Sequence, residues 1–533
     1  MRQRLTASSA ERSSRRGFVL VVIMVLVVSV AFAGFAFVQT MSNEYRAVHI
    51  DGDLLEAEQV LASADVMVRH FIDLSHEQRD EAGGWSNNPE LFQNQVIAQS
   101  TDEEVSESDD SLRWRFSVVS PPDDAPSLLE TTGVRSGLEN ESAKLNLGNL
   151  INLELEQQNG GRLALMQLPG MTEIAADSIM DWIDADDVAR EFGAESEFYR
   201  ELPNPYRPRN ALPTSLDELL LVRGVHRILL YGADRNLNFR IDADEREVEA
   251  LTTQLVSETE DNPLPERGWA SMVTLHSAER NVDRTGEPRF NLNNPNLSEL
   301  HASLSEVLPV EMVEFIIRWR QYGPATASTS SPPATSVSLD LTIPAVFEFV
   351  TPMDIVEVHT YAAMMPAPIV VPSPVLSSSI EEINLLLDHT TVRIESVLRN
   401  RININLASPA VLRTIPHMTD ELVDRLVNTR ETLDNAARQS AAWLLTEQVL
   451  SLETFRAVLP FVTTGGDVFR AQVIAWRPVG GPSRRVELLL NGATETVGRI
   501  RWRDLTSLGV GFPVSQLSSA RAESPFAGSG FGP

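Results

Sequence analysis

Oxygen-bearing side chains recur along residues 234–245 with the spacing of a calcium-binding loop. Counted from the first residue of this segment, positions one, three, five, nine and twelve carry them: Asp234, Asn236, Asn238, Asp242 and Glu245. Calcium takes about six to eight oxygens, and the backbone carbonyl of Arg240 would add one at position seven. Phe239 stands at position six, where glycine normally makes the sharp turn, so a bound loop would be strained there. The spacing predicts a structural calcium clip, with a solvated Asp/Asn turn as the alternative.

A second group of carboxylates lies earlier in the chain, at Asp184, Asp186, Asp187 and Glu195. Carboxylates placed so close together repel one another unless they face water or share a cation. A second, weaker calcium site is therefore one interpretation. The other is an acidic helix end that only caps the helix and interacts with water.

The sequence offers no catalytic constellation. Its nine histidines have no paired H-x-x-x-H spacing, and it contains neither a G-x-S-x-G elbow nor a Walker loop. Carboxylate pairs are expected by chance in a chain this acidic. We therefore expect a protein that is not an enzyme.

Composition narrows the class of partner. The formal net charge of −30 argues against nucleic acid, because binding to polyphosphate relies on Lys and Arg. It suits a chain that binds cations or basic partners. There is no cysteine, so no disulfide can form and packing or metal must supply stability.

The first forty residues carry the strongest signal. Five arginines precede Gly17 and Phe18, and residues 18–38 then contain no charge. Such a helix spans the roughly 30 Å hydrocarbon core of a bilayer, with the arginines on the cytoplasmic side and the bulk of the chain across the membrane. A candidate cleavage site, Arg15-Arg16-Gly17-Phe18, precedes the apolar run, whereas a signal peptide is cut after it. Cleavage there would leave Phe18 as the new N-terminus and Val22 as the fifth mature residue. An ordinary single-pass anchor is the alternative.

Three segments repeat one pattern: a basic residue, alternating apolar and Asn positions, then two helices around a Pro turn. Their openings are KLNLG at residues 144–148, RFNLN at 289–293 and RININ at 401–405. The pattern resembles the helix-hairpin-helix unit, in which hairpin glycines bring backbone N–H groups to a phosphate. Only the first turn keeps glycine, and acids follow all three, so protein contact is favoured over DNA binding. The turn residues are Pro169 and Gly170, then Pro309, then Pro416 and His417, the last standing where glycine would sit.

These signals predict an α+β protein of several parts. We expect a leader (1–17), a transmembrane helix (18–38), a helix with the first strands of a head (39–143), and a helical domain with the calcium-like loop (144–250). A second repeat region (265–323), a Ser/Pro-rich linker (324–338), a third repeat region (339–465), a small C-terminal β-domain (466–517) and a disordered tail (518–533) would follow.

The leader, Val22, the KLNL opening, the turn LPGMT at residues 168–172 and DWIDADD at 181–187 occur together and in this order. Together they resemble the minor pseudopilin K family of the type II, or general, secretion pathway, from Arg15 to about Val225. Most pilin-like subunits carry glutamate where this chain has Val22, and its absence is typical of the K subunit. The later repeats and the C-terminal strands look like an enlargement of that family.

The resemblance implies a pilin-like head with an inserted helix-hairpin-helix or SAM-like helical domain, and calcium bound in that domain. It implies a place at the tip of a pseudopilus in the bacterial inner membrane, where the protein helps to initiate assembly and to move folded cargo across the outer membrane. The partners would be other minor and major pseudopilins, the inner-membrane platform of the secretion system and a prepilin peptidase, with no nucleic acid. The alternative is a membrane-anchored helix-hairpin-helix protein for DNA binding and uptake.

Overall fold

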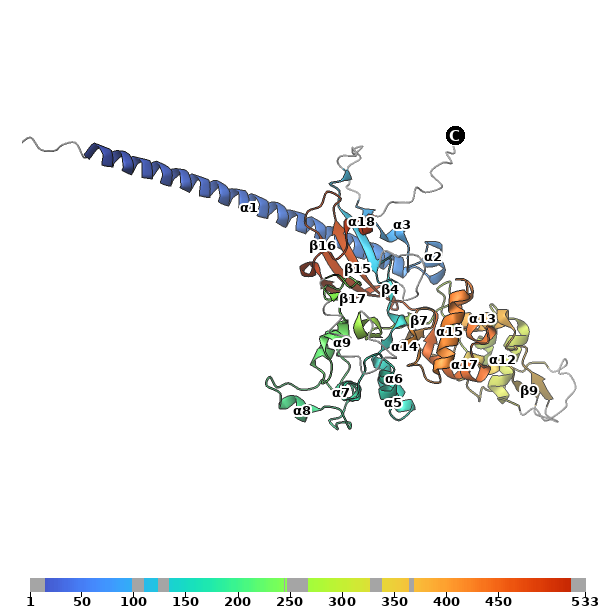
Figure 1. Cartoon of the computed structure of the whole chain (residues 1–533). Coiled ribbons are helices and arrows are strands. Elements are labelled where there is room, and N and C mark those ends of the chain that lie inside the picture. Colours follow the sequence, from blue (N-terminus) through green and yellow to red (C-terminus); the bar gives the residue numbers. More distant parts are fainter. Residues whose placement is uncertain are drawn as a thin grey trace, which may run out of the picture.

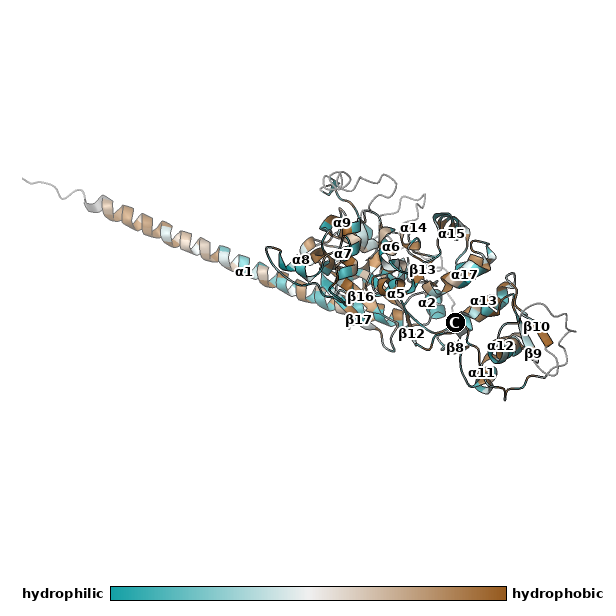
Figure 2. Cartoon of the chain, turned by 90° about the horizontal axis from the view of Figure 1, so that it is seen from below, coloured by the Kyte–Doolittle hydropathy of each residue, from teal (hydrophilic) through white to brown (hydrophobic). Residues whose placement is uncertain are grey.

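A single helix dominates the outline of the molecule. The computed structural model describes residues 15–97, 110–122, 134–243, 245–246, 267–325, 338–363 and 369–518. Helix α1 (Arg15–Asp73) has 59 residues and is therefore about 88 Å long at a rise of about 1.5 Å per residue. It projects from the rest of the chain (Figure 1), and its distal half is the hydrophobic part (Figure 2). Side chains from Phe18 to Gly52 are exposed, so this half packs against no described part of the chain.

The second half of α1 is the spine of a head domain. From Ala57 onward one face of the helix is buried, with Leu61, Ala64 and Val68 at helical spacing. This face packs on sheet residues that include Val118, Val473 and Leu488. The buried helix and sheet side chains together form one apolar core. The helix ends at Asp73, and a separate helix, α2 (His76–Glu81), follows it. Ser75 caps α2 by accepting from the backbone N–H of Gln78.

The head sheet is assembled from both ends of the described chain. Its strands run in the order β1 (Gln95–Val96), β2 (Arg115–Ser120), β15 (Val468–Trp476), β16 (Arg484–Asn491) and β17 (Gly498–Asp504). Two short strands complete it, since β3 (Arg135–Ser136) pairs with β2 and β4 (Glu139–Asn140) pairs with β15. Helices α3 (Pro89–Phe92) and α18 (Val514–Leu517), with the 3-10 turns Glu141–Ala143 and Thr506–Leu508, border the sheet.

This topology corrects the expected separate C-terminal β-domain over 466–517. Strand β15 lies between β2 and β16 and is antiparallel to both. The apolar face of β15 and β16 needs a cover, and α1 supplies it. All the residues between β4 and β15 therefore form an insertion within the head, and β2 is one of the head strands expected within residues 39–143.

The insertion contains three modules that are closed in the same way. Module one is residues 144–274, module two 289–391 and module three 401–463. Each begins with a two-residue strand that pairs in parallel with another two-residue strand at its end: β5 (Leu145–Asn146) with β6 (Val273–Thr274), β8 (Phe290–Asn291) with β11 (Thr390–Thr391), and β13 (Ile402–Asn403) with β14 (Val462–Thr463). In each opening the Asn side-chain oxygen accepts from the backbone N–H two residues later, at 2.9 Å in all three modules.

The closing strands change the predicted boundaries. Because β8 pairs with β11, residues 339–391 complete module two and do not begin a third repeat region. The Ser/Pro-rich stretch 324–338 thus falls inside module two rather than between modules, although residues 326–337 lie outside the described part of the chain. The true connections between modules are β7 (Ala278–Arg280) and β12 (Val397–Arg399), which pair with each other in antiparallel fashion.

Short helices fill each module and share one continuous apolar core. Module one contains α5 (Gly148–Glu156), α6 (Gly160–Met166), α7 (Glu173–Ile183), α8 (Ser196–Arg200), α9 (Arg227–Tyr231) and 3-10 turns at Leu216–Leu221 and Gly268–Ser271. Module two contains α11 (Leu297–Leu304), α12 (Val310–Tyr322), α13 (Ile380–His389), a 3-10 turn at Pro352–Ile355 and a hairpin of β9 (His359–Ala363) with β10 (Ile369–Pro372). Module three contains α14 (Pro409–Leu412), α15 (Asp420–Thr432), α16 (Trp443–Thr446), α17 (Leu452–Val458) and 3-10 turns at Ala437–Gln439 and Leu459–Phe461.

The hairpin turns of modules one and three have the same backbone shape. Gly170 and His417 both have φ of +66°, the left-handed conformation that glycine adopts most readily. In both modules a threonine then caps the next helix: Thr172 accepts from Ala175 N–H at 3.2 Å, and Thr419 accepts from Leu422 N–H at 3.4 Å. His417 therefore takes the glycine position, as its alignment in the repeat indicates.

Candidate metal centres

The first candidate centre forms where α7 ends and α8 begins. Helix α7 is amphipathic and ends at Ile183, so Trp182 and Ile183 point into the core while the acids that follow turn outward. The chain then loops to Glu195, the residue just before α8. Carboxylate oxygens of Asp184, Asp186 and Glu195 lie within 4.8 Å of one another. The structure thus brings together three of the four residues predicted for the weaker site.

Glu195 is the most unusual member of this cluster. Its side chain is 5% exposed, and neither carboxylate oxygen has a hydrogen-bond partner among the described residues. Burial and the neighbouring carboxylates Asp181, Asp184 and Asp187 raise the pKa of Glu195 to about 8. A buried acceptor is normally satisfied, because leaving it without a partner costs free energy. The carboxylate therefore lacks a counter-charge that a cation would supply.

One arginine partly compensates the cluster. Arg190 Nη1 lies 2.7 Å from Asp181 Oδ1 and 2.5 Å from Asp184 Oδ2. Asp181 is fully buried, and desolvation raises its pKa even so. Asp187 lies at the edge of the cluster and accepts from the backbone N–H of Ser196 at 3.2 Å, and hydrogen bonds from the Ser196 side chain and backbone lower its pKa. Asp181 and Arg190 were not predicted as members of this centre from the sequence. The one sequence feature that could have indicated them is the number of acidic residues around Arg190.

The second candidate centre is the loop from Asp234 to Glu245, and it closes on itself. The carboxylate of Asp234 accepts from the N–H groups of Asn238 and Phe239 at 3.1 and 2.9 Å. Glu245, at the other end, accepts from the N–H groups of Arg235 and Asp242 at 2.7 and 3.0 Å. All five predicted oxygen-bearing side chains are therefore gathered in one turn, with Arg240 between them.

The carboxylates at the two ends of this loop are buried. Asp234 is 3% exposed and Glu245 1% exposed, and neither forms an ion pair with Arg or Lys among the described residues. Burial, with a smaller contribution from Glu245, raises the pKa of Asp234 to about 6. The amides of Asn236 and Asn238 donate to Asp242 Oδ2 at 2.8 and 2.9 Å. This donor set of carboxylates and amides is one that calcium accepts.

Phe239 makes the turn for which glycine would be expected. Its φ is +67°, a conformation that costs a bulky residue free energy. Its ring lies 6.2 Å from that of Phe512, and the guanidinium of Arg267 lies 5.1 Å above it. The contact with Phe512 joins this turn of module one to the end of the head, and the contact with Arg267 lies within module one.

The remaining predicted residues are spread over the molecule. Gly17, Phe18 and Val22 lie near the start of α1, far from both acidic centres (Figure 1), and the Val22 side chain is 47% exposed. Pro169 accepts through its carbonyl from Trp269 Nε1 at 2.7 Å, so the first hairpin turn packs within module one. Pro309 precedes α12, and Pro416 precedes His417 in module three.

Comparisons with known proteins agree with the architecture of module one. The family model described as "Type II secretion system (T2SS), protein K" matches residues 143–231. Type II secretion system protein K of Pectobacterium carotovorum subsp. carotovorum is 28% identical over 171 residues, which cover 28% of this chain and 50% of the relative. The chain thus spans half the length of the curated relative that it matches.

A solved structure adds a weaker likeness. The crystal structure of the GspK-GspI-GspJ complex from the enterotoxigenic Escherichia coli Type 2 Secretion System includes a chain 10% identical to this one. The alignment covers 85% of this chain and 98% of that chain, with a TM-score of 0.30, which is too low to show a common fold over the whole length. Residues 143–231 are therefore similar to the domain of type II secretion system protein K, and the predicted resemblance to that family is confirmed.

Proposed function

We propose that this protein is a membrane-anchored minor pseudopilin that caps or initiates a type II secretion pseudopilus. The observation that carries the proposal is the protein K match over module one, within a chain whose α1 runs without interruption from an apolar anchor into a head. Its role would be structural rather than enzymatic. It would help the filament to move folded proteins across the outer membrane.

The anchor supports this placement. The apolar half of α1 has a mean hydropathy of 3.0 over its best window, and none of that window is buried. A helix of this length and composition is long enough to cross a bilayer. The arginines before it favour a cytoplasmic N-terminus, so the head and modules would lie in the periplasm of a bacterial inner-membrane protein.

Val22 supports the tip position. A carboxylate within the membrane is costly unless a partner neutralises it. The resemblance to pilin-like subunits implies that the glutamate usual at this position meets the free amine of the adjoining subunit. A subunit with Val22 would lack that contact on one side and fit the end of a filament better than its shaft. Its neighbours would be other minor and major pseudopilins, assembled on the inner-membrane platform.

A structural divalent cation, calcium by its ligand preference, fits both acidic centres. Asp184, Asp186 and Glu195 would hold one ion, with Asp187 beside them. Asp234, Asn236, Asn238, Asp242 and Glu245 would hold another with the carbonyl of Arg240. Each ion would neutralise buried carboxylates and so stabilise module one.

Processing of the leader tests the proposal. The full chain is expressed with a prepilin peptidase, and its N-terminus is read by mass spectrometry. We expect the first residue to become Phe18. The matched variant Gly17→Leu, which adds a side chain at the cleaved bond, should stay full length. An intact arginine-rich N-terminus in the unmodified chain would contradict the proposal.

A further inference from the structure

In two of the three modules, a basic residue, a glutamate and a threonine form the same set of contacts beside the opening strand. In module one, Lys144 Nζ lies 2.9 Å from Glu141 Oε1, and Thr274 Oγ1 donates to the other oxygen of that carboxylate. In module three, Arg401 Nη1 lies 2.9 Å from Glu279 Oε1, and Thr463 Oγ1 donates to Glu279 Oε2. The basic residue that opens each of these repeats is thus paired with a buried glutamate.

Module two keeps the basic residue, Arg289, and the threonine, Thr391, but among the described residues no glutamate joins the two. Asn281 contacts Thr391, with Nδ2 3.4 Å from Thr391 Oγ1. Arg289 Nε donates to the backbone carbonyl of Asp388 at 2.8 Å, and Arg289 forms no ion pair among the described residues. Burial lowers its pKa despite the nearby carboxylates. Glu279 is engaged by Arg401, so Arg289 is left as a cation without a carboxylate of its own.

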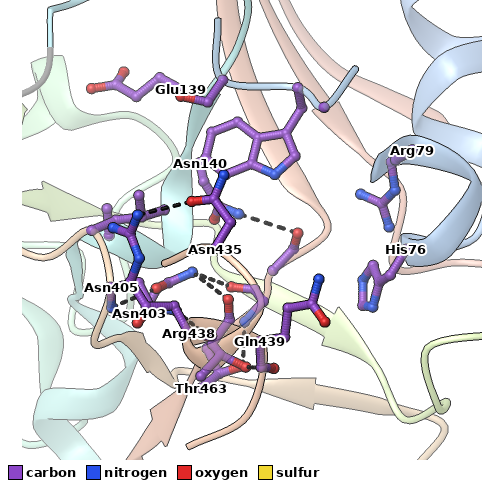
Figure 3. Close-up of a pocket in the computed structure, with 18 of the residues that line it drawn as sticks. His76, Arg79, Glu139, Asn140, Asn403, Asn405, Asn435, Arg438, Gln439 and Thr463 are labelled. Carbon is purple, nitrogen blue, oxygen red and sulfur yellow. Dashed lines mark hydrogen bonds between the residues drawn. The ribbon is translucent and has the colours of Figure 1, made fainter. Parts of the chain in front are cut away.

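Arg289 lines a large cavity between the head and the modules. The cavity has a volume of about 810 Å³ and is lined by eight arginines and one lysine against five carboxylates. A positive excess is unexpected in a chain with a net charge of −30. Cavities of about 300–1,000 Å³ are the size of ligand sites. In Figure 3, His76 and Arg79 lie on one side of the space, with Asn403, Asn405 and Arg438 on the other.

Other cations in the cavity are also incompletely compensated. Arg438 hydrogen bonds to the carbonyl of Asp434 and the amide oxygen of Asn435, and forms no ion pair among the described residues. The single carboxylate of Asp467 is shared by Arg79 at 2.6 Å, His76 at 3.4 Å and Arg280 at 3.7 Å. Arg79 is 2% exposed, and its Nε has no hydrogen-bond partner in the described structure.

The rest of the lining favours a peptide over a small anion. Asn405 donates to the carbonyl of Arg438 at 2.7 Å, while its own buried side-chain oxygen has no hydrogen-bond partner in the described part of the chain. A free acceptor suits a peptide N–H and repels a phosphate oxygen. A second cavity of about 530 Å³ shares Arg284 and Arg289 with the first and has an apolar wall that includes Leu385 and Leu459.

We propose that this cavity binds an acidic peptide segment of a partner protein, with Arg289 and Arg438 pairing with its carboxylates. Arginine forms two parallel hydrogen bonds to a carboxylate and so fixes its orientation. The unpartnered oxygen of Asn405 would accept from the peptide backbone. The inference does not depend on the secretion role and would hold for any position of the chain in a filament.

The test is fluorescence anisotropy on the full chain in detergent micelles, with fluorescein-labelled hexaglutamate as the probe. We expect saturable binding that weakens at least tenfold in Arg289→Met and in Arg438→Gln, and that weakens with added salt. The matched control is Arg425→Gln, which removes an exposed arginine of α15 outside the cavity and should bind as the parent does. Labelled hexaglutamine should not bind.

Two results would overturn the inference. One is equal affinity of the parent and both cavity variants for hexaglutamate, with their melting temperatures showing that they are folded. The other is binding of inorganic phosphate in place of hexaglutamate, measured by calorimetry on the same samples, because the cavity would then be a site for a small anion.

Discussion

At the scale of single residues, module one contains a buried carboxylate for which the described residues supply no hydrogen-bond donor. Glu195 is 5% exposed and lies beside Asp184 and Asp186. Its pKa in the metal-free fold is about 8, above the ordinary value of 4.5. A raised carboxyl pKa means that the folded state binds a proton more tightly than the unfolded state. The metal-free fold therefore loses stability as the pH rises from about 4.5 to about 8.

Replacing Glu195 tests this cation site. In EDTA at pH 8, Glu195→Gln should melt roughly 3 °C or more above the parent, because the uncompensated charge is gone. Calcium should raise the melting temperature of the parent and raise that of the variant less. The control is Glu197→Gln, which removes an exposed acid of α8 nearby. If calcium raised the melting temperature of Glu195→Gln as much as that of the parent, Glu195 would not be a ligand of the ion.

A second prediction at this scale compares the basic residues that open modules one and two, Lys144 and Arg289. Lys144 is 2% exposed and lies between Glu139 at 3.0 Å and Glu141 at 2.9 Å. Lys144→Met would leave Glu139 paired with Arg267 alone and Glu141 paired with Arg470 alone. It should cost about 3 kcal/mol, the lower end of the range for breaking a buried ion pair, seen as a fall in melting temperature. Arg289→Met removes a cation with no ion-pair partner and should leave the melting temperature unchanged or raise it. Equal losses in both variants would show that Arg289 has a structural partner after all.

At the scale of elements, the hairpin turns show which local features can be read from a sequence. The repeat alignment places His417 at the glycine position, and its φ of +66° equals that of Gly170. The anchor helix and strand β2 are equally local, since hydrophobic periodicity over one segment is enough to predict them. The gathering of residues 234–245 into one turn also follows from spacing within a single loop.

The left-handed conformation of His417 predicts how substitutions at this turn change stability. The left-handed conformation costs an ordinary residue about 1–2 kcal/mol, and glycine avoids this while adding backbone entropy to the unfolded chain. His417→Gly should therefore raise stability by up to about 1 kcal/mol. His417→Val, with a β-branched side chain, should lower it by about 1–2 kcal/mol. Thermal melting of the two variants beside the parent measures both, and a stable Val variant would contradict the turn geometry.

What the sequence could not predict was pairing between distant segments. Residues 468–504 read as strands, but nothing local indicates that β15 pairs with β2 across the whole insertion. The closing strands β6, β11 and β14 have two residues each, too few for any periodicity. The cationic cavity was missed for the same reason, since Arg79, Arg289 and Arg438 come from three different parts of the chain.

At the scale of the whole molecule, the parts have different tasks. The exposed apolar half of α1 is available to a membrane and to other helices, and its second half holds the head sheet. The modules form a bulky mass at the far side of the head (Figure 1). In the role proposed above, such a mass and Val22 in place of a carboxylate would place the chain at the end of a filament, where crowding by further subunits is absent on one side.

Immunogold labelling of purified pseudopili tests this account most directly. An antibody against module three is applied to filaments assembled with the full set of subunits, and the gold particles are located by electron microscopy. The account predicts label at one end of each filament and none along the shaft. Regular label along the shaft would contradict it.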